Sequence, residues 1–159
     1  MSHLKVAIAS DHAGFDLKQF VVTLLSEQAE IDEVQDLGTD SHASCDYPDF
    51  AVAVARTVAS GGADWGILIC GTGVGMSVAA NKIPGIVAAL CADCYTARMA
   101  REHNDANILC MGGRVIGPGV AEDIVLSFMH TEPITAQERY TRRREKVSRL
   151  DDRTATEQT

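Results

Sequence analysis

The segment from Trp65 to Lys82 limits the possible folds more than any other part of the chain. It begins with a short apolar run, WGILI, that is rich in β-branched residues and typical of a buried parallel strand. Three glycines then fall within the five residues GTGVG, and small residues predict a helix over 76–81. Such a turn leaves backbone N–H groups uncovered at a helix N-terminus, where the helix dipole favours an anion. The segment therefore predicts an anion-binding turn between a strand and a helix.

Cys70 lies between this strand and the glycine turn. A thiol at the start of such a turn can have its pKa lowered enough to supply thiolate near neutral pH. A cysteine that ends a strand is, however, more often a small buried residue than a catalyst. From the residues alone, both interpretations of Cys70 stay open.

The rest of the chain alternates between strand and helix patterns. Expected strands are 4–9, 31–37, 65–69, 86–91 and 107–111; expected helices are 15–28, 48–60, 76–81, 95–102, 118–129 and a last one that follows a capping box at 135–138. This alternation over short loops predicts a three-layer α/β sandwich, with a five-stranded parallel sheet and a C-terminal helix. We expect one domain over residues 1–150, with the last helix ending near Leu150, and a flexible polar tail at 151–159.

Charge and composition exclude some classes of partner. The 159-residue chain carries a formal net charge of −8, which disfavours nucleic acid. No apolar run approaches the ~20 residues of a membrane-spanning helix, and the N-terminus lacks a signal-peptide pattern, so we expect a cytoplasmic protein without a membrane partner. Its five cysteines are then expected to be free thiols. Seven of the fourteen Lys and Arg residues lie within 139–153, which suits a small anionic ligand or a solvated helix.

Polar residues follow several of the predicted strands. Asp11 and His12 come after the first strand, Cys70 and the glycines after the third, and Arg114 after the fifth. Ligands of such sheets bind outside the carboxyl ends of the strands, so we expect these groups to meet in one cleft. Taken singly, Asp11 and His12 could instead cap the following turn, and Arg114 could be a solvated residue.

These residue types fit proton transfer on a phosphorylated sugar. Arginine and histidine bind phosphate, and histidine and aspartate supply an acid and a base for opening a sugar ring. Moving a carbonyl from C1 to C2 needs a base for the carbon-bound proton and donors for the enediolate oxygen. Cys70 and the N–H groups of the glycine turn meet these needs, and neither a metal nor a cofactor is required.

Two other functions are less well supported by the sequence. The glycine turn alone could bind a nucleotide, but the dinucleotide pattern requires a glycine where this chain has Met76. Cys91 and Cys94 form a CxxC pair typical of redox or zinc sites, but a second ligand pair at suitable spacing is absent. We therefore expect no metal site.

Separate motifs between residues 4 and 150 resemble one family. The segments SDHAGFDLK, DYPDFA, GILICGTGVGMSVAANK, REHNDANIL and GGRVIG are similar, in this order, to ribose-5-phosphate isomerases of the B type. The wider family also acts on galactose, allose and four-carbon sugar phosphates. The resemblance implies a Rossmann-like fold and interconversion of ribose 5-phosphate and ribulose 5-phosphate. It also implies a dimer or tetramer whose sites borrow residues from a neighbouring subunit.

The resemblance implies roles for individual residues. Cys70 matches the base that moves a proton between C1 and C2, and Thr72 matches the hydroxyl that helps move or hold the enediolate proton. His103 matches the ring-opening residue, with Asp11 as its expected polar partner. The matches to the substrate-binding set are His12, Tyr47, Gly71, Gly73, Val74, Gly75, Asn104, Arg114, Arg139 and Arg143.

The basic C-terminal helix offers a choice of arginines. Arg139 and Arg143 are four residues apart and share a helix face, which favours them over Arg142 and Arg144. Without the family, a structural role for His103, as a helix C-cap or a partner of the helix dipole, is as well supported as a functional role.

One departure from part of the family concerns the base. Some members lack the cysteine and use a glutamate just beyond the glycine turn, at the position of Met76 here, which leaves Cys70 as the base. The alternatives to the ribose reaction are the same chemistry on a sugar phosphate of four or six carbons, and a non-catalytic phosphate- or nucleotide-binding module.

Overall fold

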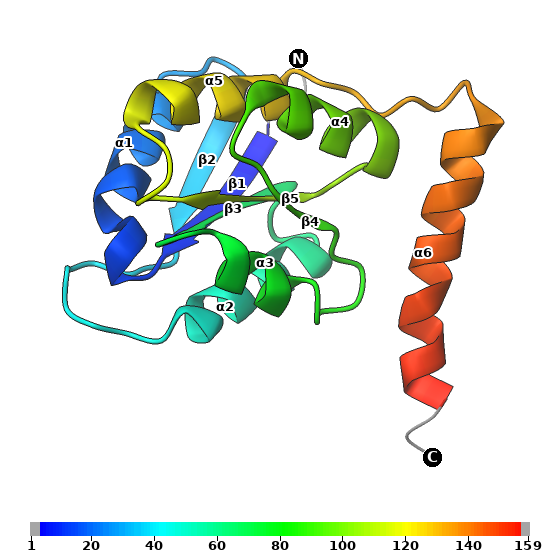
Figure 1. Cartoon of the computed structure of the whole chain (residues 1–159), viewed down its shortest axis with the longest axis horizontal. Coiled ribbons are helices and arrows are strands. Elements are labelled where there is room, and N and C mark those ends of the chain that lie inside the picture. Colours follow the sequence, from blue (N-terminus) through cyan, green and yellow to red (C-terminus); the bar gives the residue numbers. More distant parts are fainter. Residues whose placement is uncertain (1–3, 157–159) are drawn as a thin grey trace.

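The computed structural model describes residues 4–156, whose arrangement is shown in Figure 1. Its strands are β1 (Leu4–Ser10), β2 (Ile31–Asp36), β3 (Trp65–Cys70), β4 (Ala88–Leu90) and β5 (Ile108–Gly112). Its helices are the 3-10 turn η1 (His12–Gly14), α1 (Phe15–Ser26), α2 (Tyr47–Ala59), α3 (Val74–Ala80), α4 (Cys94–Asn104), α5 (Pro118–Met129) and α6 (Glu138–Thr156). Each predicted strand and helix is present, with ends that differ by a few residues.

The strands form one parallel, five-stranded sheet in the order β2-β1-β3-β5-β4. The chain passes outward from β1 to β2 and then crosses back to β3 on the other side of β1. The carboxyl ends of β1 and β3 therefore flank a point where the strand order reverses, and α/β sheets bind ligands at such points. The predicted α/β fold with five parallel strands is confirmed.

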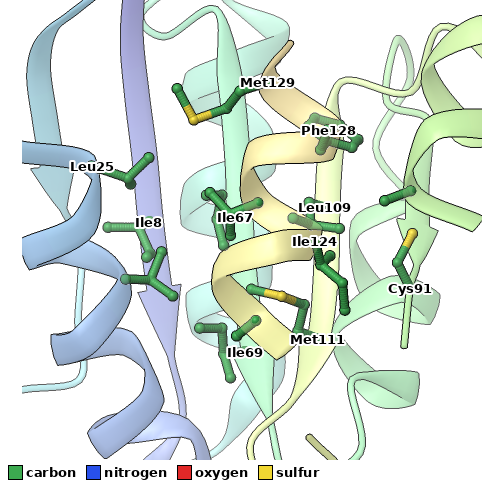
Figure 2. Packing of buried hydrophobic residues seen from close by; sticks show 14 of the residues in the cluster. Ile8, Leu25, Ile67, Ile69, Cys91, Leu109, Met111, Ile124, Phe128 and Met129 are labelled. Atoms are coloured by element: carbon green, nitrogen blue, oxygen red, sulfur yellow. The ribbon is translucent and has the colours of Figure 1, made fainter. Parts of the chain in front are cut away.

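Side chains alternate between two apolar layers, one on each face of the sheet. Ile67 and Ile69 of β3 face the layer covered by α1, α4 and α5, and Figure 2 shows them in one apolar cluster with Ile124 of α5. Leu68 and Cys70 face the opposite layer, covered by α2 and α3. This period of two, which the pleat of a strand imposes, directs the Cys70 side chain toward α2 and α3.

The C-terminal helix α6 stands apart from this sandwich (Figure 1). Tyr140 near its start is buried, whereas Val147 and Leu150 further along are 52% and 55% exposed. The Asp151 carboxylate accepts a hydrogen bond from the N–H of Gly85 at 2.8 Å. Helix α6 is therefore attached near both ends and presents apolar side chains to the outside.

The predicted end of this last helix near Leu150 was wrong. Helix α6 continues through residues 151–156, which the sequence placed in a polar tail. This stretch contains neither glycine nor proline, so nothing in it breaks a helix, and the Asp151 contact lies within it. Residues 157–159 of the predicted tail lie outside the described residues.

Arg101 is a buried cation that stabilises the end of α4. Its guanidinium lies 5.3 Å from the ring centroid of Trp65 and 5.5 Å from that of Phe128. It donates hydrogen bonds to the Asp105 carboxylate and the Ala106 carbonyl, both at 2.7 Å. Asp105 has a φ of 51°, in the left-handed region. The Arg101 contacts therefore hold the strained turn that ends α4.

Replacing Arg101 with methionine is expected to destabilise the protein by about 2–4 kcal/mol, because a buried carbonyl loses its donor and the aromatic rings lose their cation. Urea unfolding followed by circular dichroism measures the loss. Arg98→Met is the matched control, since Arg98 lies on the same helix with a side chain that is 53% exposed. Its expected effect is within about 0.5 kcal/mol. Equal losses of unfolding free energy in the two variants would contradict the stabilising role of Arg101.

Candidate active site

Backbone hydrogen bonds join the loops that follow β1, β3 and β5. The N–H of Asp11 donates to the Ile69 carbonyl at 3.1 Å, and the N–H of Gly113 donates to the Cys70 carbonyl at 2.8 Å. The predicted meeting of these loops at the carboxyl ends of the strands is therefore observed.

Glycines allow these loops to approach so closely. A Cβ on Gly14 would lie 2.5 Å from the carbonyl oxygen of Ile69. A Cβ on Gly112 would lie 2.8 Å from the carbonyl carbon of Thr72. Because the atoms met are backbone atoms, a side chain at either position would force the loops apart.

The Cys70 thiol lies inside the glycine turn. Cys70 is 5% exposed, and the N–H of Gly73 donates to its sulfur at 3.1 Å. Gly73 precedes α3 and has a φ of 79°, which glycine adopts without strain. A backbone N–H at the start of a helix, directed at sulfur, is a contact that a thiolate would accept. The turn thus places the thiol beside a backbone donor.

Thr72 lies within the same glycine turn, and Tyr47 packs against it. The Thr72 hydroxyl accepts a hydrogen bond from the N–H of Val74 at 3.3 Å. The ring of Tyr47, the first residue of α2, packs on Gly75, where a Cβ would lie 2.8 Å from it. The absence of a side chain at Gly75 therefore admits the tyrosine ring.

Arg114 adjoins the glycine turn from the loop after β5, and His12 lies in η1, after β1. The Arg114 N–H donates to the Gly71 carbonyl at 3.0 Å, and its guanidinium would lie 3.7 Å from a Cβ on Gly71. His12 Nδ1 accepts a hydrogen bond from the N–H of Cys45 at 3.3 Å. With Nδ1 as an acceptor, a neutral His12 ring carries its proton on Nε2.

Asp11 caps the turn η1. Its Oδ1 accepts hydrogen bonds from the N–H groups of Ala13 at 2.9 Å and Gly14 at 3.1 Å. The sequence left open whether Asp11 caps the turn after β1, and the structure shows that it does. The cap fixes the carboxylate at the carboxyl end of the sheet.

The other predicted site residues lie at the opposite end of the sheet. Helix α4 leads into the amino end of β5, where Ile108 pairs with Gly66 of β3. Cys70 lies at the other end of β3, roughly 13 Å away at ~3.3 Å per residue. Within one chain, the structure does not bring the thiol together with this second group, which consists of His103, Asn104, Arg139 and Arg143.

The second group lies between α4 and α6. Asn104 and Arg143 line a cavity of about 430 Å³ between α6 and the loops around it. The His103 ring stacks on the ring of Tyr140, with centroids 4.4 Å apart and planes at 11°. The Arg139 guanidinium lies 4.5 Å from the Tyr140 centroid. Sequence reasoning missed Tyr140, although it is the lone aromatic residue in the charged stretch 138–156.

Two buried cysteines, Cys91 and Cys110, have raised pKa values. Burial, together with the charge of Asp93, raises the pKa of the Cys91 thiol to about 12. Burial raises the pKa of Cys110 well above its ordinary value, and the nearby thiols of Cys70 and Cys91 add to the shift.

Among residues 4–156, no group of three or more His, Cys, Asp or Glu is arranged to hold a metal ion. In the same range, no helix combines the length and apolar character needed to cross a membrane.

Comparison with known proteins shows the class of protein. The family model described as Ribose/Galactose Isomerase matches residues 6–147, and the chain belongs to this family. The match covers both groups of candidate residues, those at the glycine turn and those between α4 and α6.

Individual relatives are similar over most of the chain. The putative sugar phosphate isomerase YwlF of Bacillus subtilis is 52% identical over 130 residues, which cover 81% of this chain and 86% of the relative. Ribose-5-phosphate isomerase B of Escherichia coli is 50% identical over 121 residues, covering 76% and 80%.

Solved structures agree with the fold. The type B ribose 5-phosphate isomerase of Trypanosoma brucei has a TM-score of 0.88 at 50% identity, covering 94% of this chain and 99% of that one. Ribose-5-phosphate isomerase B of Clostridium thermocellum has a TM-score of 0.90 at 46% identity, covering 95% and 99%. The predicted family, Rossmann-like fold and enzyme class, a sugar-phosphate isomerase, are confirmed.

Cys91 and Cys110 are expected to resist alkylation in the folded protein. A pKa of about 12 leaves on the order of one Cys91 thiolate in a thousand at pH 9, and burial blocks access. Iodoacetamide treatment at pH 9 followed by mass spectrometry is expected to find the half-buried Cys45 and Cys94 modified first. Treatment in urea, where all the thiols are exposed, is the control. Rapid modification of Cys91 in the folded protein would contradict the prediction.

Proposed function

We propose that this protein interconverts ribose 5-phosphate and ribulose 5-phosphate through an enediolate. The relatives that are named ribose-5-phosphate isomerases of type B support this substrate. The observation that carries the proposal is the hydrogen bond from the Gly73 N–H to the Cys70 sulfur, at 3.1 Å. It joins a candidate base to a backbone donor of the glycine turn, at the end of the sheet where such folds bind ligands.

In the proposed reaction, Cys70 acts on carbon and the glycine turn acts on oxygen. The Cys70 thiolate removes the proton from C2 of the open-chain aldose, and the electron pair forms the C1–C2 double bond while O1 becomes negative. N–H groups of the turn stabilise this enediolate oxygen. The Thr72 hydroxyl relays the O2 proton to O1. Cys70 then returns its proton to C1, which completes the ketose without a metal or a cofactor.

A second copy of the chain is proposed to complete the site. His103 is separated from Cys70 by the length of β3, so the two meet only if a neighbouring subunit supplies one of them. Exposed apolar side chains near the glycine turn and on α6 support such a contact between copies. Val74 and Val78 beside the glycine turn are 50% and 54% exposed, and α6 presents Val147 and Leu150.

In the shared site, ring opening, sugar binding and phosphate binding use residues from both copies. His103 of the partner subunit opens the furanose ring next to Asp11, which is fixed by its cap. Tyr47 and the partner subunit's Asn104 contact sugar hydroxyls. The phosphate is bound by charged side chains from both copies, which are His12, Arg114, the partner's Arg139 and the partner's Arg143.

Replacing Cys70 with alanine is expected to lower kcat by about 10²–10⁴-fold, because proton transfer to and from carbon loses its base. Cys70→Ser is expected to lose nearly as much, since a serine hydroxyl is not ionised near neutral pH. Cys94→Ala is the control, because Cys94 is a half-buried thiol outside the glycine turn. Full activity in Cys70→Ala, measured as ketose formation, would remove Cys70 as the base.

A panel of sugar phosphates tests the substrate. We expect kcat/KM to be highest for ribose 5-phosphate among four-, five- and six-carbon aldose phosphates. A higher value for another sugar would assign the same chemistry to that substrate. Nucleotide binding by calorimetry, with no turnover of any sugar phosphate, would contradict the proposal and favour a binding module.

A further inference from the structure

We propose that Tyr140 is a positioning residue that holds His103 and Arg139 as one stacked unit. The inference rests on the proposed isomerase function, in which His103 opens the sugar ring and Arg139 binds the phosphate. Tyr140 is absent from the site residues predicted from the sequence. It joins two side chains that act on different parts of the substrate.

The Tyr140 ring covers one face of the His103 imidazole. The centroid distance of 4.4 Å and the interplanar angle of 11° are those of a stacked pair. Tyr140 is only 7% exposed, although most of α6 is exposed. Contact with a buried ring fixes the plane of the imidazole, so its nitrogen atoms point in a defined direction.

The same tyrosine orients Arg139. The Arg139 guanidinium carbon lies 4.5 Å from the Tyr140 ring centroid, and Nη2 donates to the Tyr140 hydroxyl at 2.6 Å. A free arginine side chain samples many rotamers, which costs entropy when it binds an anion. The contact with Tyr140 reduces that cost before the phosphate arrives.

A second residue of α6 holds the backbone of His103. Arg144 Nη1 donates to the His103 carbonyl at 3.5 Å, and Nη2 donates to the Ile134 carbonyl at 3.1 Å. Both the ring and the backbone of His103 therefore contact the first turns of α6. The position of this helix determines where the imidazole points.

Two substitutions separate the ring of Tyr140 from its hydroxyl. Tyr140→Leu removes the stack and is expected to lower kcat for ribose 5-phosphate by about 10–100-fold, as expected for a misplaced catalytic group. Tyr140→Phe keeps the stack but removes the acceptor for Arg139, so we expect a higher KM and an unchanged kcat. Phe20→Leu removes a ring on α1 that packs against the core and is the control, with kcat and KM expected to stay at the wild-type values.

A spectroscopic signal tests the stack without relying on turnover. The NMR signal of the His103 Hε1 proton, identified by its loss in His103→Asn, lies in the ring current of Tyr140. We expect it to move in Tyr140→Leu and to stay nearly in place in Tyr140→Phe. An unmoved signal in Tyr140→Leu would overturn the proposed stack.

The outcomes distinguish this inference from the proposed function. If the wild-type protein turns over ribose 5-phosphate and Tyr140→Leu has an unchanged kcat, the positioning role is overturned. An equal loss of kcat in Phe20→Leu would overturn it as well, since the effect would then be general. If Tyr140→Leu does not fold, an unchanged KM in Tyr140→Phe overturns the link to Arg139. If the wild-type protein turns over no sugar phosphate, the proposed function fails, and the NMR comparison still decides whether Tyr140 orders His103.

Discussion

The parallel pairing of β3 with β1 and β5 determines at which end of the sheet Cys70 and His103 lie. Because all the strands run in one direction, residues that follow a strand gather at one end of the sheet. Residues that precede a strand gather at the other end. Cys70 follows β3 and His103 precedes β5, so the register that builds the glycine-turn site also keeps His103 away from it within one chain.

The two ends of the sheet are built by different physical means. At the carboxyl end, backbone groups make the closest contacts, and Gly14 and Gly112 are needed because a Cβ would meet backbone atoms within 3 Å. At the amino end, side chains make the contacts, through the stack of His103 on Tyr140 and the buried guanidinium of Arg101. The backbone donors of the glycine turn are therefore held in place by the fold, whereas the orientation of His103 depends on packing against α6.

Local patterns were sufficient to predict much of the fold and part of the site. The glycine turn lies within one short segment, so its strand, its turn and the place of Cys70 followed from periodicity and glycine content. The strand order β2-β1-β3-β5-β4 could not be predicted from these local patterns, because it is determined by packing between distant segments. For the same reason, the packing of Tyr47 on Gly75 and the stack of Tyr140 on His103 could not be read from spacing. The sequence of residues 151–156 has no apolar residues at helical spacing, which led to the wrong predicted end for the last helix.

The most direct test of the account mixes two inactive variants, Cys70→Ala and His103→Ala, so that their subunits reassort. If each site takes Cys70 from one copy and His103 from another, each mixed dimer has one intact site. Random assortment then restores about a quarter of the wild-type activity per subunit. If mixed dimers form, as shown by mass spectrometry, and no activity returns, the claim that two copies share one active site is contradicted.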